Sequence, residues 1–82
     1  MDQSKIIEMM QSDDYRERFK AEYYQLKDRH QKLHLMLAKY RLSKLDFTPK
    51  CSITLLEEQE RYMELYLFCL EERAEIEEIE LS

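Results

Sequence analysis

The residues of this chain whose chemistry could support metal binding or catalysis are two histidines and two cysteines. His30 and His34 lie four residues apart, and on a helix this spacing places both rings on one face, as in helical zinc sites. The next residue after His30 is Gln31, where a zinc peptidase needs a glutamate as general base. His30 and His34 are therefore candidate metal ligands that lack the base of a zinc peptidase. The alternative is that His30 packs inside a helix pair while His34 faces solvent.

Neither cysteine indicates catalysis. Cys51 precedes an expected helix, where a thiol can be activated, but neither histidine is close to it in the sequence. Cys69 has the surroundings of a small buried hydrophobic residue. The two lack Cys-x-x-Cys spacing and form no disulfide framework, so we expect reduced thiols and a cytoplasmic location. With no glycine-rich loop, triad or acid pair, we predict a protein that is not an enzyme and has no cofactor.

The charge of the chain is divided between two segments. Residues 15–50 hold ten Lys or Arg against four Asp or Glu, and residues 51–82 hold ten Glu against two Arg. One interpretation is that a basic helix neutralises an acidic one, with Arg16, Arg18 and Lys20 opposite the acidic end. The other is that the acidic end binds a basic protein. The candidate partner-binding residues are Glu71, Glu72, Glu75 and Glu78.

A basic surface with an aromatic residue could also contact nucleic acid. Tyr24 lies near Lys20 and Lys27. The net charge of -5 and the absence of any nucleic-acid-binding motif argue against this function. No apolar run approaches the roughly 20 residues that cross a bilayer, so we expect no membrane association.

The composition predicts an all-α fold, because the chain has no glycine, one proline and many strong helix formers. We expect a single domain of residues 1–82, with an N-terminal segment (1–12), a first long helix (13–42), a loop containing Pro49 (43–51) and a second long helix (52–80). The short loop predicts an antiparallel hairpin. A heptad pattern in the first helix comprises Phe19, Tyr23, Leu26, His30, Leu33, Leu37 and Tyr40. The inward residues expected in the second helix are Leu56, Gln59, Met63, Tyr66, Leu70 and Arg73.

The second long helix is apolar on more than one side. The residues that point away from its expected packing face are Tyr62, Leu65, Phe68 and Cys69. They require a cover, which is either the N-terminal segment or a second copy of the chain. Because a two-helix hairpin is too thin to be stable alone, we predict that these residues mediate self-association. The expected product is a homodimeric four-helix bundle.

A set of positions spread over both long helices and the loop carries a resemblance to known proteins. They are Asp14, Tyr15, Arg18, Glu22, Leu26, Leu33, Phe47, Pro49, Leu55, Leu56, Gln59, Met63, Tyr66, Leu70 and Arg73. With these residues, the chain resembles short helical-hairpin proteins of temperate and crAss-like phages over about residues 14–79. The resemblance implies a phage or prophage gene, and small acidic phage proteins often bind and block a host protein, CRISPR nucleases included.

The resulting prediction is a non-enzymatic protein-binding module of phage origin that inhibits a host protein, such as a CRISPR nuclease, in the host cell cytoplasm. Its expected partners are a second copy of itself and a basic host protein. Two alternatives stay open. One is a structural, self-associating helical protein without an inhibitory role, and the lesser one is a helical protein that binds nucleic acid.

Overall fold

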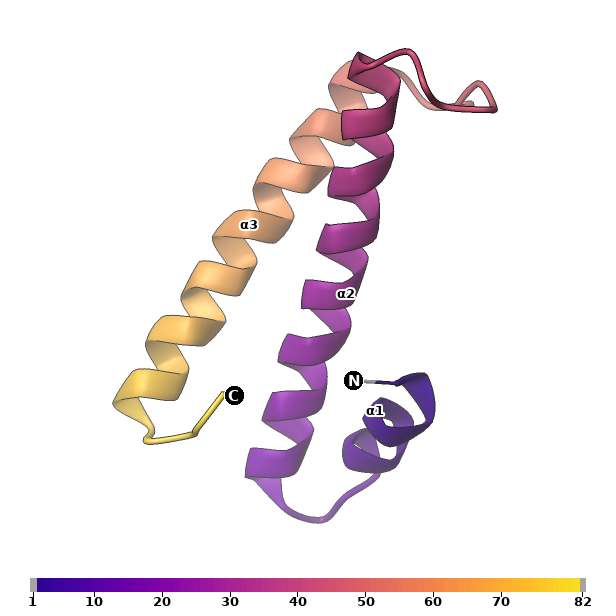
Figure 1. The fold of residues 1–82 in the computed structure, drawn as a ribbon. Helices are drawn as coiled ribbons and strands as arrows, with labels where there is room; N and C mark the ends of the chain where they lie inside the picture. Colours follow the sequence, from indigo (N-terminus) through magenta and orange to yellow (C-terminus); the bar gives the residue numbers. More distant parts are fainter. Residues whose placement is uncertain (1, 82) are drawn as a thin grey trace.

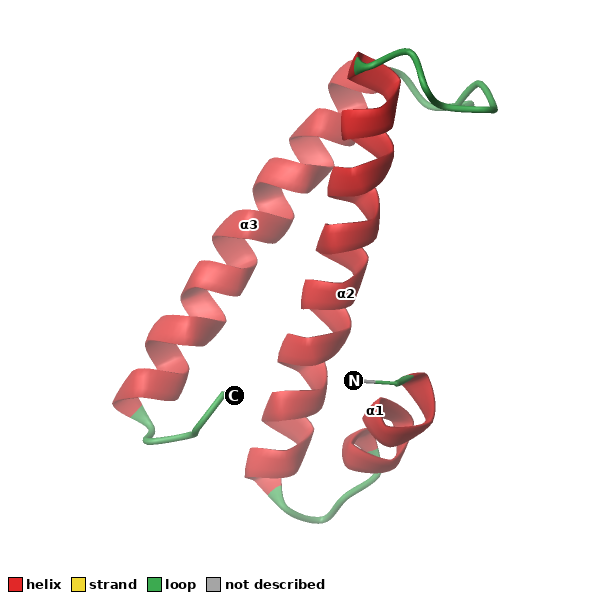
Figure 2. Ribbon diagram, in the orientation of Figure 1, coloured by secondary structure: helices red, strands yellow, loops and turns green. Residues whose placement is uncertain are grey.

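The fold is a hairpin of two long helices, with a short N-terminal helix packed at its open end (Figures 1 and 2). A computed structural model describes residues 2–81 and contains α1 (Gln3–Met10), α2 (Tyr15–Arg41) and α3 (Ile53–Ile76). No strand occurs among the described residues, which confirms the predicted all-α class. α2 and α3 run antiparallel, and α1 packs against α2 without contacting α3.

Each helix begins at a side chain that accepts a hydrogen bond from a free backbone amide. Asp2 accepts from the amide of Lys5, at 2.8 Å, and Asp14 accepts from the amide of Arg16, at 2.9 Å. Ser52 caps α3 by accepting from the amide of Leu55 at 3.1 Å. These caps satisfy amide donors that have no partner within the helix. The negative charges of the two aspartate caps are also stabilised by the positive end of the helix dipole.

Both long helices end in a residue with a left-handed backbone. Ser43 follows α2 and Glu78 follows α3, each with φ of 58°. After Ser43, the amide of Lys44 donates to the Lys39 carbonyl at 2.8 Å. After Glu78, the amide of Ile79 donates to the Ala74 carbonyl, five residues back, also at 2.8 Å. This is the Schellman termination, here without glycine. It ends α3 at Ile76, so the predicted extension of this helix to residue 80 is wrong.

Replacing Ser43 by glycine is expected to stabilise the fold by about 0.5–1 kcal/mol, because glycine alone has no Cβ to oppose positive φ. Thermal unfolding should show a melting temperature higher by roughly 2–8 °C for a domain of this size. Ser43→Ala is the matched control, since alanine retains a Cβ and should give no gain. Equal melting temperatures for the glycine and alanine variants would contradict the assignment of strain to this position.

The main apolar core lies at the open end of the hairpin. Its buried residues come from α2, α3 and the C-terminal tail, and are Phe19, Tyr23, Leu70, Ala74 and Ile79. The tail turns back toward α2 after α3 ends (Figure 1), which carries Ile79 into this cluster. A second cluster joins α1 to α2 through Ile6, Met9 and Ala21. Because α1 docks on α2, it does not cover the outer side of α3.

The heptad pattern predicted for α2 agrees only in part with the observed burial. Phe19, Tyr23 and Leu37 are buried, and His30 is half-buried. Tyr40 was expected to face inward but is 46% exposed, because it lies in the last turn of α2. Leu26 and Leu33 are half-buried.

The packing face of α3 differs from the predicted one. Leu70 is buried and Leu56 and Met63 are half-buried, as expected. The other expected inward residues face solvent, and they are Gln59, Tyr66 and Arg73. Tyr66, at 46% exposure, uses its hydroxyl to donate to Glu22 of α2 from the edge of the interface.

The second inward line of α3 consists of Glu60, Leu67 and Ala74, one position further along the helix. Glu60 and Leu67 are half-buried and Ala74 is 3% exposed. The small side chain of Ala74 is buried in the same cluster as the ring of Phe19. Arg73 instead lies over that ring, with its guanidinium carbon 4.9 Å from the ring centroid. Compared with the predicted face, α3 is rotated so that Ala74 is buried in place of Arg73. This avoids the cost of burying an arginine.

Candidate functional site

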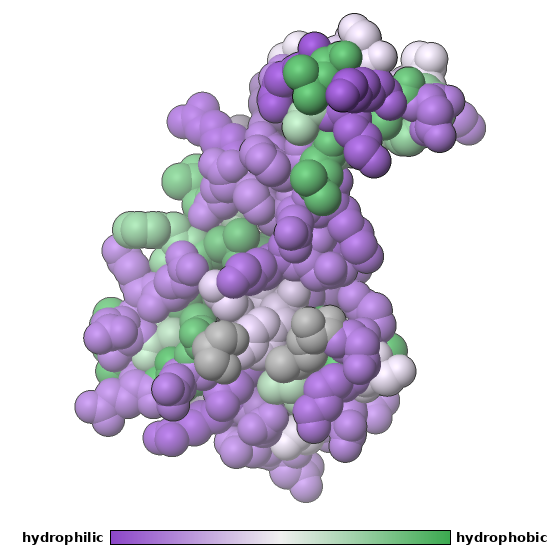
Figure 3. All heavy atoms as spheres, in the orientation of Figure 1, coloured by the Kyte–Doolittle hydropathy of each residue, from purple (hydrophilic) through white to green (hydrophobic). Residues whose placement is uncertain are grey.

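The outer face of α3 exposes several large apolar side chains. Tyr62, Leu65 and Phe68 are 63%, 54% and 59% exposed, and Cys69 is exposed as well. Cys69, expected to be a buried hydrophobic residue, is thus exposed in the single chain, and α1 does not cover it. Figure 3 shows hydrophobic side chains gathered along α3 and around the loop that follows α2. These four residues are those predicted to mediate self-association, and self-association itself stays a prediction.

The outer residues of α3 form a heptad line of their own. Leu55, Tyr62, Cys69 and Ile76 recur every seven residues, and all are exposed. Leu65 lies between the second and third of them on the same side of the helix. A heptad line on a face that no helix of the same chain covers has the spacing required to pack against another helix.

A shallow groove of about 460 Å³ follows one edge of this line. The side chains around it belong to α3 alone, and they are Leu55, Glu58, Gln59, Tyr62, Met63 and Tyr66. Its surface is therefore mostly aromatic and aliphatic. It is too open to enclose a small molecule, but it suits the side chains of a helix laid alongside.

The acidic end of α3 contains glutamates with and without partners. Glu71 accepts a hydrogen bond from the hydroxyl of Tyr23 at 2.9 Å. Burial of the Tyr23 ring, helped by this bond, raises the pKa of Tyr23 to about 12. Glu77 accepts from the hydroxyl of Tyr15 at 2.9 Å and from Nε of Arg73 at 3.2 Å. The two tyrosine bonds link α2 to the end of α3, whereas the bond between Arg73 and Glu77 lies within the end of α3 itself.

Four glutamates of this end have no bonded partner among residues 2–81. They are Glu72, Glu75, Glu78 and Glu80, and all four are exposed. The ion pairs expected from Arg16, Arg18 and Lys20 do not form; the Arg18 guanidinium donates instead to the Ser12 carbonyl at 2.8 Å. Ion pairs between the long helices lie toward the loop, as in Arg41 with Glu57 at 3.1 Å.

The surface that the sequence suggested for nucleic acid is occupied by contacts within the chain. Tyr24 is half-buried and its ring meets that of Tyr23 edge-on, with centroids 5.6 Å apart. The ammonium of Lys27 lies 5.6 Å from the ring centroid of Tyr23. The aromatic ring that could stack on a base is thus already packed against its neighbour.

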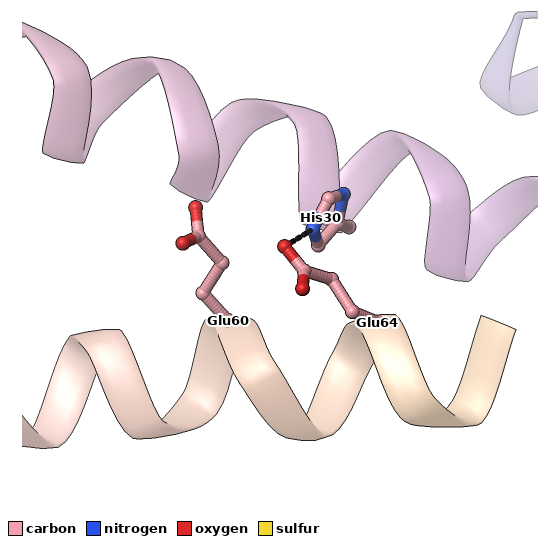
Figure 4. Close-up of side chains that lie close together, drawn as sticks. All are labelled: His30, Glu60 and Glu64. Atoms are coloured by element: carbon pink, nitrogen blue, oxygen red, sulfur yellow. Dashed lines mark hydrogen bonds and ion pairs between the residues drawn. The ribbon is translucent and has the colours of Figure 1, made fainter. Parts of the chain in front are cut away.

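The two histidines lie between α2 and α3, opposite two glutamates that the sequence did not single out. His30 Nε2 is 3.1 Å from Glu64 Oε1, and His34 Nδ1 is 2.9 Å from Glu60 Oε2. The His30 and His34 rings stack, with centroids 6.0 Å apart. The i, i+4 spacing of Glu60 and Glu64 mirrors that of the histidines, and this was the signal available in the sequence. Figure 4 shows both glutamates reaching from α3 toward α2.

Cys51 is exposed in the loop that precedes α3. The histidines lie along the middle of α2, and their hydrogen-bond partners are glutamates of α3. The structure therefore pairs neither histidine with Cys51 as a base.

The part of the chain that forms the hairpin matches a known protein family. The family model named Sequestin matches residues 13–76, which span α2, the loop and α3. The chain belongs to the Sequestin family. The match begins beside the Asp14 cap and ends with the last residue of α3, so the helical hairpin is the part shared with the Sequestin family. No curated protein and no solved structure matches the chain.

The name Sequestin indicates a binding or sequestering role. None of the helices within residues 2–81 combines the length and apolar character needed to cross a membrane. In this Sequestin-family hairpin, the outer face of α3 exposes large apolar side chains, and the acidic end exposes glutamates without a bonded partner.

Proposed function

We propose that this protein is a non-catalytic binding protein that acts as a dimer and inhibits a basic host protein by binding and sequestering it. The outer heptad line of α3 packs against its copy in a second chain. The acidic end of α3 remains accessible and binds the partner. Such a protein works by stoichiometric occupation of its target, which agrees with the sequestering role that the family name indicates.

The observation that carries the proposal is the apolar surface left exposed on α3. The chain has an accessible surface of 6380 Å², whereas a compact monomer of this mass has about 5,300 Å². The excess of roughly 1,000 Å² is close to the ~800 Å² that each partner buries in a standard protein interface. A second copy supplies a matching heptad line, and the pairing closes two hairpins into a four-helix bundle.

The acidic end supports a basic partner. Glu72, Glu75 and Glu78 repel one another and oppose the dipole at the end of α3, at a cost of about 0.3–1 kcal/mol each. No cationic side chain among residues 2–81 pairs with them. A basic surface that binds here offsets this cost, and complementary charge also speeds the encounter.

The resemblance to short phage proteins supports an inhibitory role in the cytoplasm of an infected cell. Phage proteins of this size and acidity often block host defence proteins, CRISPR nucleases among them, and such nucleases carry basic surfaces for nucleic acid. The proposal therefore places the target among basic host proteins that bind nucleic acid.

Reversing the charge of the acidic end is expected to abolish target binding while leaving the fold and the dimer intact. The experiment captures proteins from an extract of the infected host with the wild-type chain and with Glu72→Lys/Glu75→Lys/Glu78→Lys, and identifies them by mass spectrometry. The matched control is Glu8→Lys/Asp13→Lys/Asp46→Lys, which changes the net charge equally at three exposed positions outside α3.

A target bound by the wild-type and control chains, but lost from the first variant, assigns binding to the acidic end. Equal capture by both variants would exclude this surface. If no protein is captured while the dimer forms, the structural alternative, a self-associating protein without an inhibitory role, replaces the inhibitor.

A further inference from the structure

The cluster formed by His30, His34, Glu60 and Glu64 plays no part in the proposed binding surfaces. It spans the middle of the hairpin, with the histidines on α2 and the glutamates on α3. Figure 4 shows three of these residues, His30, Glu60 and Glu64. One ligand atom each of His30, Glu60 and Glu64 lies within 4.8 Å of the other two. These three residues therefore already converge on one point between the helices.

The convergence follows from the antiparallel arrangement of the helices. Residues four apart lie one above the other on a helix face. Because α3 runs opposite to α2, a step of four residues forward from His30 corresponds to a step of four back from Glu64. The same registration that brings His30 to Glu64 thus brings His34 to Glu60, and the two pairs form adjacent layers.

We propose that His30, Glu60 and Glu64 bind a divalent transition-metal ion, for which Zn²⁺ is the representative. Imidazole nitrogen and carboxylate oxygen are ligands that Zn²⁺ accepts, at distances near 2.0–2.2 Å. In tetrahedral geometry such ligand atoms lie about 3.3 Å apart. The ligand atoms of this cluster, all within 4.8 Å of one another, must draw together to reach that separation.

The exposure of the three ligands suits an ion with an open coordination position. The side chains of His30 and Glu60 are 20% and 14% exposed, and that of Glu64 is 55% exposed. Water reaches the site from the Glu64 side and completes the coordination. His34 holds Glu60 through Nδ1 at 2.9 Å, so it is a positioning residue that orients a ligand.

The ion joins α2 to α3 where the core is thin. Between Tyr23 and Leu37, α2 has no buried residue. The two carboxylates also repel each other on one helix face, and a divalent cation between them offsets this repulsion. Since an ion that binds only the folded chain stabilises it, Zn²⁺ is expected to raise the melting temperature of the protein.

The test titrates Zn²⁺ into the untagged full chain, followed by calorimetry and by thermal unfolding. The expected result is one ion per chain and a higher melting temperature. His30→Ala, Glu60→Gln and Glu64→Gln should each weaken Zn²⁺ binding at least tenfold, and His34→Ala should weaken it less. Glu58→Gln, an exposed carboxylate of α3 outside the cluster, should bind as the wild type does.

Three further measurements separate this site from other sources of binding. Co²⁺ should give the intense visible absorption of a tetrahedral site, and this absorption should be lost in Glu60→Gln, whose helicity is checked by circular dichroism. Cys51→Ser/Cys69→Ser should retain Zn²⁺ binding; its loss would assign the ion to the thiols. Equal affinity for Mg²⁺, or unchanged Zn²⁺ affinity in His30→Ala, would overturn the proposal, because general attraction to acidic residues then explains the binding.

Discussion

Replacing Leu65 by aspartate is expected to dissociate the protein into single chains, with a dissociation constant raised at least about 100-fold. Leu65 lies at the centre of the outer heptad line and is 54% exposed in the single chain. Burying a leucine contributes about 1.5–3 kcal/mol, and a two-fold interface loses the contact twice. An aspartate buried there without a partner adds a further desolvation cost. Phe68→Asp is expected to act in the same direction.

Light scattering over a range of concentrations measures the mass in solution. Leu35→Asp is the matched control, because Leu35 is 52% exposed on α2 and lies outside the outer line of α3. This control should keep the mass of the wild-type protein. A wild-type protein with the mass of one chain at every concentration would rule out the dimer.

The cysteines provide a second measurement of the same interface without any substitution. Cys69 lies on the outer heptad line, whereas Cys51 lies in the loop, and both are exposed in the single chain. Self-association is expected to slow alkylation of Cys69 and to leave that of Cys51 fast. In Leu65→Asp the two thiols should react at similar rates.

The second large effect is expected in the core, where Leu70→Ala should destabilise the fold by about 2–5 kcal/mol. Leu70 is 1% exposed and packs in the cluster of Phe19, Tyr23 and Ile79. The substitution removes apolar contacts and leaves a cavity. A domain of this size has a total stability of roughly 4–12 kcal/mol, so the substitution should remove a large share of it and lower the urea midpoint clearly.

Urea unfolding followed by circular dichroism measures this loss. Leu35→Ala is the control, since truncating an exposed leucine should change the free energy of unfolding by less than about 0.5 kcal/mol. Repeating the comparison in the Leu65→Asp background separates the stability of the single chain from that of the dimer. Equal midpoints for Leu70→Ala and the wild type would show that this cluster does not hold the open end together.

The sequence alone did not predict which face of α3 packs against α2. The apolar pattern of α3 fits two inward faces that share Leu56, Met63 and Leu70. One adds Gln59, Tyr66 and Arg73, and the other adds Glu60, Leu67 and Ala74. Hydrophobicity alone favours neither, because a glutamate stands on the face that is buried. The choice depends on residues of α2: His34 bonds Glu60, and Phe19 packs in one cluster with Ala74.

The sequence by itself determined that this protein is an antiparallel pair of long helices with more apolar surface than one hairpin covers. The absence of glycine, the turn at Pro49 and the heptad spacing are local properties, and local properties specify helices. Only the tertiary structure decided that α1 docks on α2, that Glu72, Glu75 and Glu78 stay unpaired, and that Glu60 and Glu64 meet the histidines. These outcomes depend on the registration and rotation of packed helices, which are set by side chains distant in the sequence.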